Sequence, residues 1–444
     1  MLTTAQMAAA FQPDPTLAYR ALVGFEYEVL CVSRRDLAPL RYEGPAGVRA
    51  ILEEVARRTG GALGGDPPAN KVPLPDGGLI SVEPGGQLEF SSAPVPTFGE
   101  CMEQLRSFLA LLDGLAERFD LHFFYGGVNP VHTVDEIGLV VANPRYRIMD
   151  AYFPRVGRHG RRMMRQSCSL QVTFDYQNAA LGTDLVRSAA YLAPIAAGIL
   201  ANAPYVDGQP TAYRSFRAAI WGDTDSSRSG LLPGFTRPDY GFEDYVKHVV
   251  RAPMFFVARP EGLVDAAGMT FETFNREGFD GRFPTEEDFL LHNSTIFTDI
   301  RLKRTVEVRS VDCQDPALVP SVLALLSGLL LCKTARARTR EVLGGLDEAA
   351  YASLSDRLGR EGLSGTTGAR PTRDVALDLV QAAREGLPTC FPDGAAADVH
   401  LDRLEALIRA GDTPADVVRR RFGDDARGWL AAGRTFSDEG SLSL

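Results

Sequence analysis

The chain has 444 residues, of which 45% are hydrophobic and 23% charged, a composition typical of a soluble globular protein with a large core. Its net charge of −10 and its pI near 5.3 argue against a surface that binds nucleic acid or an anionic membrane. Six scattered cysteines without a CxxC pair exclude a thiolate zinc site by spacing and indicate buried thiols in a reducing cytoplasm.

Targeting and membrane signals are weak in this sequence. Residues 1–15 lack the basic region and the long apolar stretch of a signal peptide. The most apolar run, 317–332, is interrupted by polar residues and is shorter than a membrane span, so we expect a buried helix there and no membrane partner.

Hydrophobic periodicity predicts mixed elements in the first three quarters of the chain. Strands are predicted at 21–33, 80–82, 87–91, 122–128, 166–176, 253–257 and 305–311. Helices are predicted at 45–59, 96–119, 145–154, 183–201, 242–249 and 286–296, and a basic loop at 155–165. Thr97, with Glu100 three residues later, has the capping-box pattern of a helix N-terminus.

From residue 319 onward the spacing is helical throughout. Helices are predicted at 319–339, 347–358, 373–385, 400–410 and 414–430, and the tail 436–444 is expected to be disordered. Residues 60–68 and 361–371 have the composition of linkers.

Four of the predicted strands alternate polar with large apolar side chains, so each has one polar face. These polar positions are Glu26 and Glu28, Gln87 and Glu89, Gln171 and Thr173, and Glu307 and Arg309. A sheet with one apolar and one charged face indicates helices over the first face and a ligand pocket over the second.

The stretch 80–91 contains the most informative of these strands. Its two halves meet at Pro84-Gly85-Gly86, where the missing side chains let a ligand or another backbone come close. Glu89 follows on a strand that otherwise reads as buried, and a buried carboxylate is costly unless a positive charge meets it. Because no Lys or Arg lies between Val72 and Val95, we expect a bound metal ion.

The residue types favour a particular cation. Oxygen ligands without cysteine or paired histidine select a hard ion such as Mg²⁺, and Mg²⁺ held by carboxylates usually serves a nucleotide phosphate. Candidates for neutralising a transferred phosphoryl group or for holding a substrate carboxylate are Arg217, Arg301, Lys303, Arg304 and Arg309. The sequence has no Walker A motif and no GxGxxG, so these patterns predict a magnesium-dependent phosphoryl-transfer enzyme without the common phosphate loops.

Each signal also has a structural interpretation. An E-x-E pair on one strand is often a solvated face, Glu89 could pair with an arginine at a rim, and Glu307 could pair with Arg309 across strands. His292 and Cys168 are interpreted as a hydrogen-bonded and a packed residue. Four polar-faced strands together favour a metal-binding site over these structural interpretations.

Several segments also resemble the plant-type glutamate–cysteine ligases, a family that is common in bacteria as well. They follow in family order and include the specific run Glu-Pro-Gly-Gly-Gln at 83–87. The segments are 24–28, 82–91, 145–149, 163–175, 202–205, 215–217, 220–225, 229–233, 245–256, 295–297, 301–304 and 307–309.

The resemblance implies an α+β fold related to glutamine synthetase. Its core is a curved, mainly antiparallel sheet that forms a funnel with helices outside. Residues 1–335 would form the catalytic ligase core, and 336–444 a helical C-terminal region packed on it. The implied enzyme uses ATP and two or more Mg²⁺ ions to phosphorylate the side-chain carboxylate of L-glutamate, and the amine of L-cysteine then attacks, giving γ-glutamylcysteine, ADP and phosphate. A cytoplasmic monomer or homodimer is expected.

The same resemblance implies roles for individual residues. Metal ligands would be Glu26, Glu28, Glu89 and Glu307, with Glu83 and Gln171 close by. Arg309 would stabilise the transferred phosphoryl group and Arg217 would bind a substrate carboxylate. Arg301, Lys303 and Arg304 would contact the nucleotide, and Tyr146 and Trp221 would line the pocket.

The chain departs from the family pattern at three places near the expected pocket. It has Val-Thr-Phe-Asp at 172–175 where relatives have Val-Asn-Leu-Asp, and His-Asn-Ser-Thr at 292–295 where they have His-Leu-Thr-Thr. At 310–312 it has Ser-Val-Asp in place of Gly-Ala-Asp. The acceptor amine therefore stays open, and a specialised ligase with another amine is the alternative. A non-catalytic amino-acid-binding relative would be expected to lose metal carboxylates, and the four expected ones are present.

Overall fold

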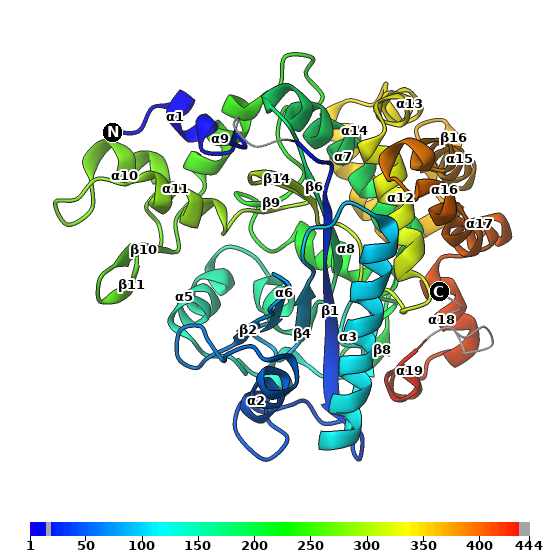
Figure 1. Cartoon of the computed structure of the whole chain (residues 1–444), viewed down its shortest axis with the longest axis horizontal. Helices are drawn as coiled ribbons and strands as arrows, with labels where there is room; N and C mark the ends of the chain where they lie inside the picture. Colours follow the sequence, from blue (N-terminus) through cyan, green and yellow to red (C-terminus); the bar gives the residue numbers. More distant parts are fainter. Residues whose placement is uncertain (15–18, 435–444) are drawn as a thin grey trace.

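The computed structural model describes residues 1–14 and 19–434, and its centre is an antiparallel sheet. The strand order is β13-β14-β6-β1-β4-β3-β2, and β5 pairs with β1 beside this path. The strands are β1 (Val23–Ser33), β2 (Lys71–Pro73), β3 (Leu79–Val82), β4 (Leu88–Ser91), β5 (Leu121–Phe124), β6 (Leu170–Asp175), β13 (Ile300–Leu302) and β14 (Thr305–Val308). With helices outside the sheet, this arrangement confirms the predicted α+β class (Figure 1).

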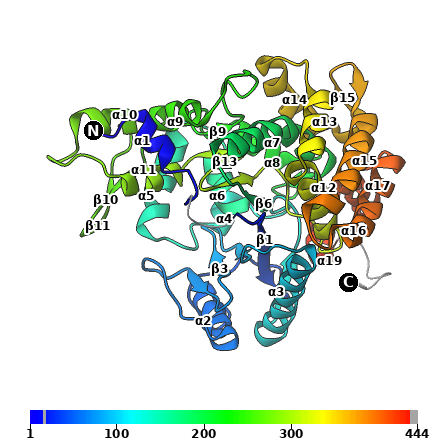
Figure 2. The same cartoon turned by 45° about the horizontal axis from the view of Figure 1, so that its top comes forward.

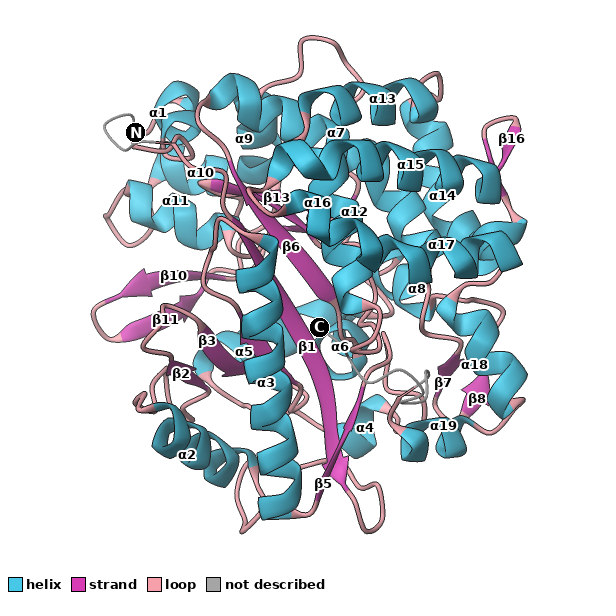
Figure 3. Cartoon of the chain, turned by 45° about the vertical axis from the view of Figure 1, so that its right-hand side comes forward, coloured by secondary structure: helices cyan, strands magenta, loops and turns pink. Residues whose placement is uncertain are grey.

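Strand β1 is the longest and holds the sheet together. It pairs antiparallel with β4, β5 and β6, and β1 and β6 run side by side through the middle of the molecule in Figure 3. The register places Glu28 opposite Glu89 and Glu26 opposite Gln171. Polar residues that are far apart in the sequence therefore become neighbours on one face of the sheet.

The tight turn between β3 and β4 sets the register of that hairpin. Gly86 has φ +90°, in the left-handed region that favours glycine. A Cβ at Gly85 would overlap the backbone of Arg165, so another segment packs directly against the turn. The predicted hinge at 84–86 is therefore confirmed as a hairpin turn under a close backbone contact.

The apolar face of the sheet is covered by helices α3 (Phe98–Phe119) and α12 (Val319–Leu331). Phe108 of α3 stacks on Phe90 of β4 with ring centroids 4.9 Å apart and meets Tyr27 of β1 edge-on at 6.1 Å. The expected start of α3 is confirmed, because the Thr97 side chain accepts a hydrogen bond from the Glu100 N–H. Burial of each such aromatic side chain stabilises the fold by about 1.5–3 kcal/mol.

Three shorter helices approach the polar face: α5 (Pro144–Tyr152), α6 (Gly160–Gln166) and α8 (Phe216–Gly222). The prediction of a basic loop over 155–165 was wrong in its second half, which is α6. Its arginines are neutralised by specific partners, since Arg162 pairs with Asp207 at 2.6 Å and Arg165 pairs with Asp150. Within this basic run Arg165 is buried and Arg162 half-buried, whereas Arg155, Arg158 and Arg161 stay exposed.

The remaining elements surround this centre (Figures 1 and 2). Helices are α1 (Thr4–Ala9), α2 (Val48–Thr59), α4 (Val134–Ile137), α7 (Ala179–Ile199), α9 (Phe242–Arg251), α10 (Phe271–Glu277) and α11 (Glu286–Asn293). Short strand pairs are β7 (Tyr205–Val206) with β8 (Gln209–Pro210), β9 (Ser229–Gly230) with β12 (Phe297–Thr298), and β10 (Phe256–Arg259) with β11 (Gly262–Asp265). The strands predicted at 122–128, 166–176 and 253–257 are shorter or shifted by a few residues.

The C-terminal part is helical, as predicted, and gathers on one side of the sheet, yellow to red in Figure 1. Its elements are α13 (Lys333–Leu343), α14 (Glu348–Glu361), α15 (Thr372–Cys390), α16 (Gly394–Ala397), α17 (Leu401–Ala410), α18 (Pro414–Phe422) and α19 (Ala426–Ala432). Residues 366–371 add the small hairpin of β15 (Thr366–Thr367) and β16 (Arg370–Pro371).

The single helix predicted over 319–339 was wrong. The backbone of Cys332 is extended, with φ −79° and ψ 124°, and it separates α12 from α13 at a 96° bend. Helix α12 is buried along nearly its whole length, which confirms the buried helix expected there. In the described part of the chain, no single helix has the length and hydropathy of a membrane span, and α12 and α13 reach that measure only when counted together.

One buried apolar cluster runs through both parts of the chain, from Met7 to Leu430. The boundary predicted between residues 335 and 336 falls inside α13, and the division into a core and a C-terminal region stays a prediction. The tail predicted to be disordered, 436–444, lies outside the described residues.

Close packing between α12 and α15 makes one glycine a sensitive position. A Cβ at Gly328 would overlap the carbonyl oxygen of Ala383. We expect Gly328→Ala to lower the free energy of unfolding by about 1–3 kcal/mol, since the helices must move apart. Urea unfolding measures this loss. The control Gly64→Ala, whose Cβ would meet its nearest neighbour at 3.9 Å, should change stability little, and equal stability of both variants would contradict the packing argument.

Candidate active site

The polar face of the sheet forms one wall of a cavity of about 330 Å³. Strands β1, β4, β6, β13 and β14 supply this wall or the residues just beyond it, and α5, α6 and α8 supply the opposite side. The predicted site residues that line it are Glu26, Glu28, Glu83, Glu89, Tyr146, Gln171, Arg217, Trp221, Arg301, Lys303 and Arg309. The structure therefore brings together eleven of the predicted residues from separate parts of the chain.

Four carboxylates stand close enough in this cavity to disfavour one another's charge. Burial, with the charges of Glu307 and Glu89, raises the pKa of Glu26 to about 7. Burial and the charge of Glu28 raise the pKa of Glu89 to about 7, although the Ser81 hydroxyl donates to Glu89 at 2.8 Å. Burial also raises the pKa of Glu83 well above its usual range. Such a group of acids is stabilised by any cation that enters it.

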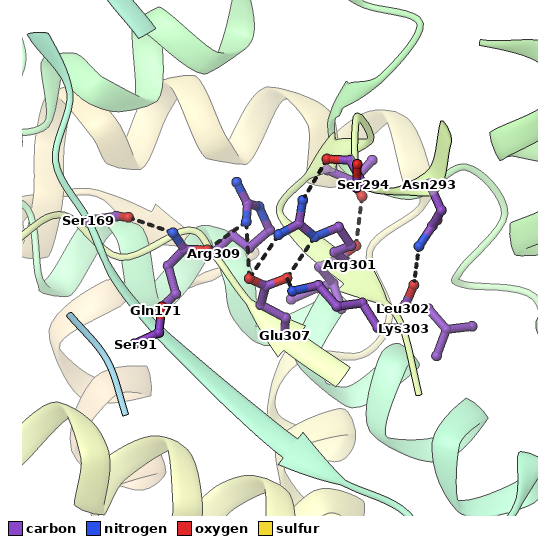
Figure 4. A network of polar contacts seen from close by, with 12 residues as sticks. Ser91, Ser169, Gln171, Asn293, Ser294, Arg301, Leu302, Lys303, Glu307 and Arg309 are labelled. Atoms are coloured by element: carbon purple, nitrogen blue, oxygen red, sulfur yellow. Dashed lines mark hydrogen bonds and ion pairs between the residues drawn. The ribbon is translucent and has the colours of Figure 1, made fainter. Parts of the chain in front are cut away.

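Glu307 is the opposite case, because three cations surround it. Its carboxylate accepts from Arg301 Nε at 2.7 Å, pairs with Lys303 Nζ at 3.1 Å and accepts from Arg309 Nη1 at 3.2 Å. Figure 4 shows these three side chains converging on it. Burial would raise the pKa of Glu307, but the three positive charges outweigh burial and hold it well below the usual range. Glu307 lies beneath the cavity wall and fixes the positive groups that line it.

Gln171 links the acidic and the basic halves of the site. Its amide oxygen accepts from Arg309 Nη1 at 2.6 Å, and its amide nitrogen donates to Glu28 at 3.2 Å. Glu28 also accepts from the Ser169 backbone N–H at 2.6 Å. This chain of hydrogen bonds orients Arg309 without neutralising it, since an amide carries no charge.

Arg217 is anchored through the two Nη atoms of its guanidinium group. They donate to the carbonyl oxygens of Arg309 at 2.9 Å and of Ser310 at 3.2 Å, and the group lies over the Trp221 ring at 5.6 Å. Asp312 fixes the start of α8 by accepting from the Ser215 hydroxyl at 2.9 Å. The Nε of Arg217 is buried and has no partner, which leaves a charged donor for a ligand.

The donor chemistry of the cavity fits Mg²⁺. Glu26, Glu28, Glu83 and Glu89 offer the hard oxygen atoms that this ion prefers, and a bound cation would relieve their mutual repulsion. Among the described residues, no group of three or more His, Cys, Asp or Glu side chains is close enough together to hold an ion, so ligation requires these side chains to move closer. The oxygens of Glu307 are occupied by three cations, so a ligand role for it would cost an ion pair.

Arg304 is the predicted site residue that the structure places elsewhere. Its side chain is 65% exposed, donates to the Ala10 carbonyl and lies 3.9 Å from Glu286. Lys303 and Arg304 form the turn between β13 and β14, and consecutive side chains of a turn diverge, so only Lys303 reaches the cavity. Arg304 is therefore corrected from a nucleotide contact to a surface residue.

Arg145 lines the cavity and was not predicted. It is half-buried, donates to the hydroxyl and the carbonyl oxygen of Ser294 at 3.2 Å each, and lies over the Phe256 ring at 5.3 Å. Burial lowers its pKa. The signal available in the sequence was its place beside Tyr146 at the start of a predicted helix, but its orientation depends on Ser294, 149 residues away.

Comparison with known proteins agrees with this geometry. The family model for glutamate–cysteine ligase family 2 matches residues 22–439. The chain is 32% identical over 405 residues to the chloroplastic glutamate–cysteine ligase of Nicotiana tabacum, covering 89% of this chain and 75% of that protein. It is 32% identical over 406 residues to the Medicago truncatula enzyme, covering 89% and 77%.

A solved structure with a similar fold is the glutamate–cysteine ligase of Francisella tularensis in complex with AMP. The TM-score is 0.57 with 12% identity, covering 95% of this chain and 90% of that chain, so this likeness shows the fold. The family match over nearly the whole chain and the identity to the plant enzymes show that the chain belongs to glutamate–cysteine ligase family 2.

Proposed function

We propose that this chain is an ATP-dependent ligase that joins the side-chain carboxylate of L-glutamate to the amine of L-cysteine, giving γ-glutamylcysteine, ADP and phosphate. One observation carries the proposal: a carboxylate cluster and an arginine cluster, drawn from separate strands, line one cavity in a member of this family. The names of the plant relatives support the choice of both substrates.

The acidic half of the cavity would hold Mg²⁺. Glu26, Glu28, Glu83 and Glu89 supply carboxylate oxygens, with Gln171 beside them. The bound ions would offset the charge of the ATP phosphates and hold the terminal phosphate in line with the glutamate carboxylate. Two or more ions are proposed, since four carboxylates exceed what one Mg²⁺ ordinarily takes from protein.

The basic half would act on the phosphoryl group and the amino acid. Arg309, Arg301 and Lys303 present positive charge to the cavity and are held by Glu307, so they can stabilise charge on the phosphoryl oxygens without reorganising. Arg217 would bind the glutamate carboxylate, and Tyr146 and Trp221 would enclose the substrate. These contacts align the carboxylate oxygen with phosphorus, which is the main demand of phosphoryl transfer.

A specialised ligase with a different amine is the second candidate. Two of the residues that depart from the family pattern stand next to ligand space: Ser294 lines the acidic cavity and holds Arg145, and Ser310 lines a neighbouring cavity. ADP release with glutamate and cysteine, compared with glutamate and a panel of other amines, separates the two candidates.

Compartment and assembly complete the proposal. The six cysteines are free, which fits the reducing cytoplasm that we propose as its location. We propose a monomer or homodimer, which sedimentation of the purified protein would distinguish.

The buried acids generate a pH prediction for the metal-free protein. The pKa values of Glu26 and Glu89 are raised from 4.5 to about 7, so the native state binds more protons than the unfolded state between these values. Stability contributed by the protonated acids is full below about pH 4.5 and is lost as pH rises through about 7. Urea unfolding between these limits should show a fall on the order of 1–3 kcal/mol.

The double variant Glu26→Gln/Glu89→Gln is the comparison for this experiment. It should lose less stability than the wild type as pH rises, because an amide does not titrate. Added Mg²⁺ should stabilise the wild type more above pH 7 than at pH 5, since protons and metal compete for the same oxygens. Identical pH dependence of both proteins would contradict the placement of these acids.

Glu89→Gln tests the catalytic cavity directly. The change keeps the shape and both serine contacts of the side chain but removes one negative charge, so we expect ATP-dependent ligation to be abolished and the fold to stay intact. ADP release with saturating substrates measures ligation, and urea unfolding measures whether the fold stays intact. Glu53→Gln, on the exposed side of α2, is the matched control with full activity. Unchanged turnover in Glu89→Gln would refute the proposed site.

A further inference from the structure

A second cavity of about 650 Å³ adjoins the acidic cavity. Arg217 and Trp221 of α8 line both, so this pair forms the partition between them. The rest of the second cavity is walled by α7 and α14 together with the strand segment that precedes β13. A ligand in the second cavity would therefore lie next to the groups that hold the first substrate.

Asp299 stands where the two cavities meet. Phe297 and Arg301, two residues to either side of it, line the acidic cavity, while Asp299 lines the second one. Its backbone is fixed on both sides, because its N–H donates to the Gly230 carbonyl at 2.9 Å and its carbonyl accepts from the Arg309 N–H at 2.9 Å. The Asp299 backbone is thus tied to Gly230 of β9 and to Arg309, one of the proposed phosphoryl-binding residues.

The Asp299 carboxylate is unusual among the acids of this cavity. Asp223 pairs with Arg158, and Asp356 accepts from Tyr213 at 2.6 Å and from Arg360 at 3.0 Å. Within residues 1–14 and 19–434, the Asp299 side chain makes no hydrogen bond or ion pair. Burial raises its pKa to about 6, against the lowering effect of Arg217 and Arg309. An acid with a pKa in this range is suited to accept a proton near neutral pH.

Unpartnered donors accompany this free acceptor. The indole N–H of Trp221 and the hydroxyl of Ser310 are buried without a hydrogen-bond partner, and both residues line the second cavity, whereas Arg217 is kept for the glutamate carboxylate. An α-amino acid carries one ammonium and one carboxylate group. The free carboxylate of Asp299 can bind the ammonium group, and the free donors can bind the carboxylate group. A ligand that is neutral or carries one charge would leave one of these protein groups without a partner.

We propose that the second cavity holds the acceptor amino acid and that Asp299 is the catalytic residue that takes a proton from its ammonium group. This inference rests on the proposed function, since it assigns the acceptor half of that reaction. Because Arg217 and Trp221 line both cavities, an acceptor in the second cavity would lie across this partition from the activated glutamate.

The step balances without a further reactant. The ammonium group gives one proton to the Asp299 carboxylate and becomes a neutral amine. Its lone pair forms the new C–N bond at the side-chain carbonyl carbon of the glutamyl phosphate. The bond between that carbon and the bridging phosphate oxygen breaks, and phosphate leaves with that electron pair. A second proton on nitrogen passes to the departing phosphate, and no group is oxidised or reduced.

Hydroxylamine makes this role testable, because it is a neutral nucleophile at neutral pH and needs no base to free its lone pair. With Asp299→Asn we expect kcat for glutamate and cysteine to fall by about 10²- to 10⁴-fold, the usual contribution of a general base. With glutamate and hydroxylamine, hydroxamate formation by the variant should stay close to the wild-type rate. A purely structural role for Asp299 would lower both rates together.

The same two assays, with cysteine and with hydroxylamine as the acceptor, also test a control variant and the outcomes that would contradict the proposal. Asp239→Asn, an exposed acid paired with Arg237 outside both cavities, should match the wild type in each. An equal loss with both acceptors, or no loss with cysteine, would overturn the role of Asp299 while the wild-type products uphold the proposed function. A wild type that forms neither product would overturn the proposed function itself, and if another amine replaces cysteine the comparison is made with that amine.

Discussion

The site depends on an unequal distribution of charge across one sheet face. On the β14 side, Glu307 is surrounded by Arg301, Lys303 and Arg309 and stays ionised. On the β1 and β4 side, Glu26 and Glu89 lack a comparable set of cations and resist ionisation together. Buried charges must be compensated, so Glu307 is compensated within the protein, whereas the acids near β1 and β4 would be compensated by a bound cation.

This division explains how one cavity can receive a nucleotide and an acid at once. The positive groups are already oriented by Glu307 and Gln171, so they can meet phosphoryl charge without rearrangement. In the proposed function, the acidic groups would gain stability when a cation binds, and that cation would also contact the phosphates. Binding energy and catalytic alignment therefore come from the same contacts, as expected for a phosphoryl-transfer enzyme.

Local patterns were enough to predict most strands of the sheet and the polar strand positions that line the cavity. Strand alternation by itself assigns Glu26, Glu28, Glu89 and Gln171 to polar strand faces, because side chains change face at every residue. The alternation of side chains is less informative where a strand ends. Arg304 follows Lys303 into the turn after β13, where alternation no longer holds. The bend at Cys332 also escaped prediction, since both flanking segments have helical spacing.

Contacts between distant segments could not be read from one sequence. Arg145 is oriented by Ser294, and Asp299 shares a cavity with Arg217 and Trp221 of α8, which are far from it in the sequence. Nothing in the residues around Asp299 distinguishes it from a surface acid. The resemblance to a family supplied roles for matching positions but could not assign the neighbouring cavity, whose walls come from α7, α8 and α14.

The turn at Gly85-Gly86 connects the folding of the β3–β4 hairpin to its chemistry. Because side chains alternate along β4, adding or removing one residue in this turn would exchange the two faces of the strand. Glu89 would then face the aromatic rings of α3, and Leu88 or Phe90 would enter the acidic cavity. Evolution of this loop is thus limited to replacements that preserve its length, and loop-length variation among related chains should fall elsewhere on the surface.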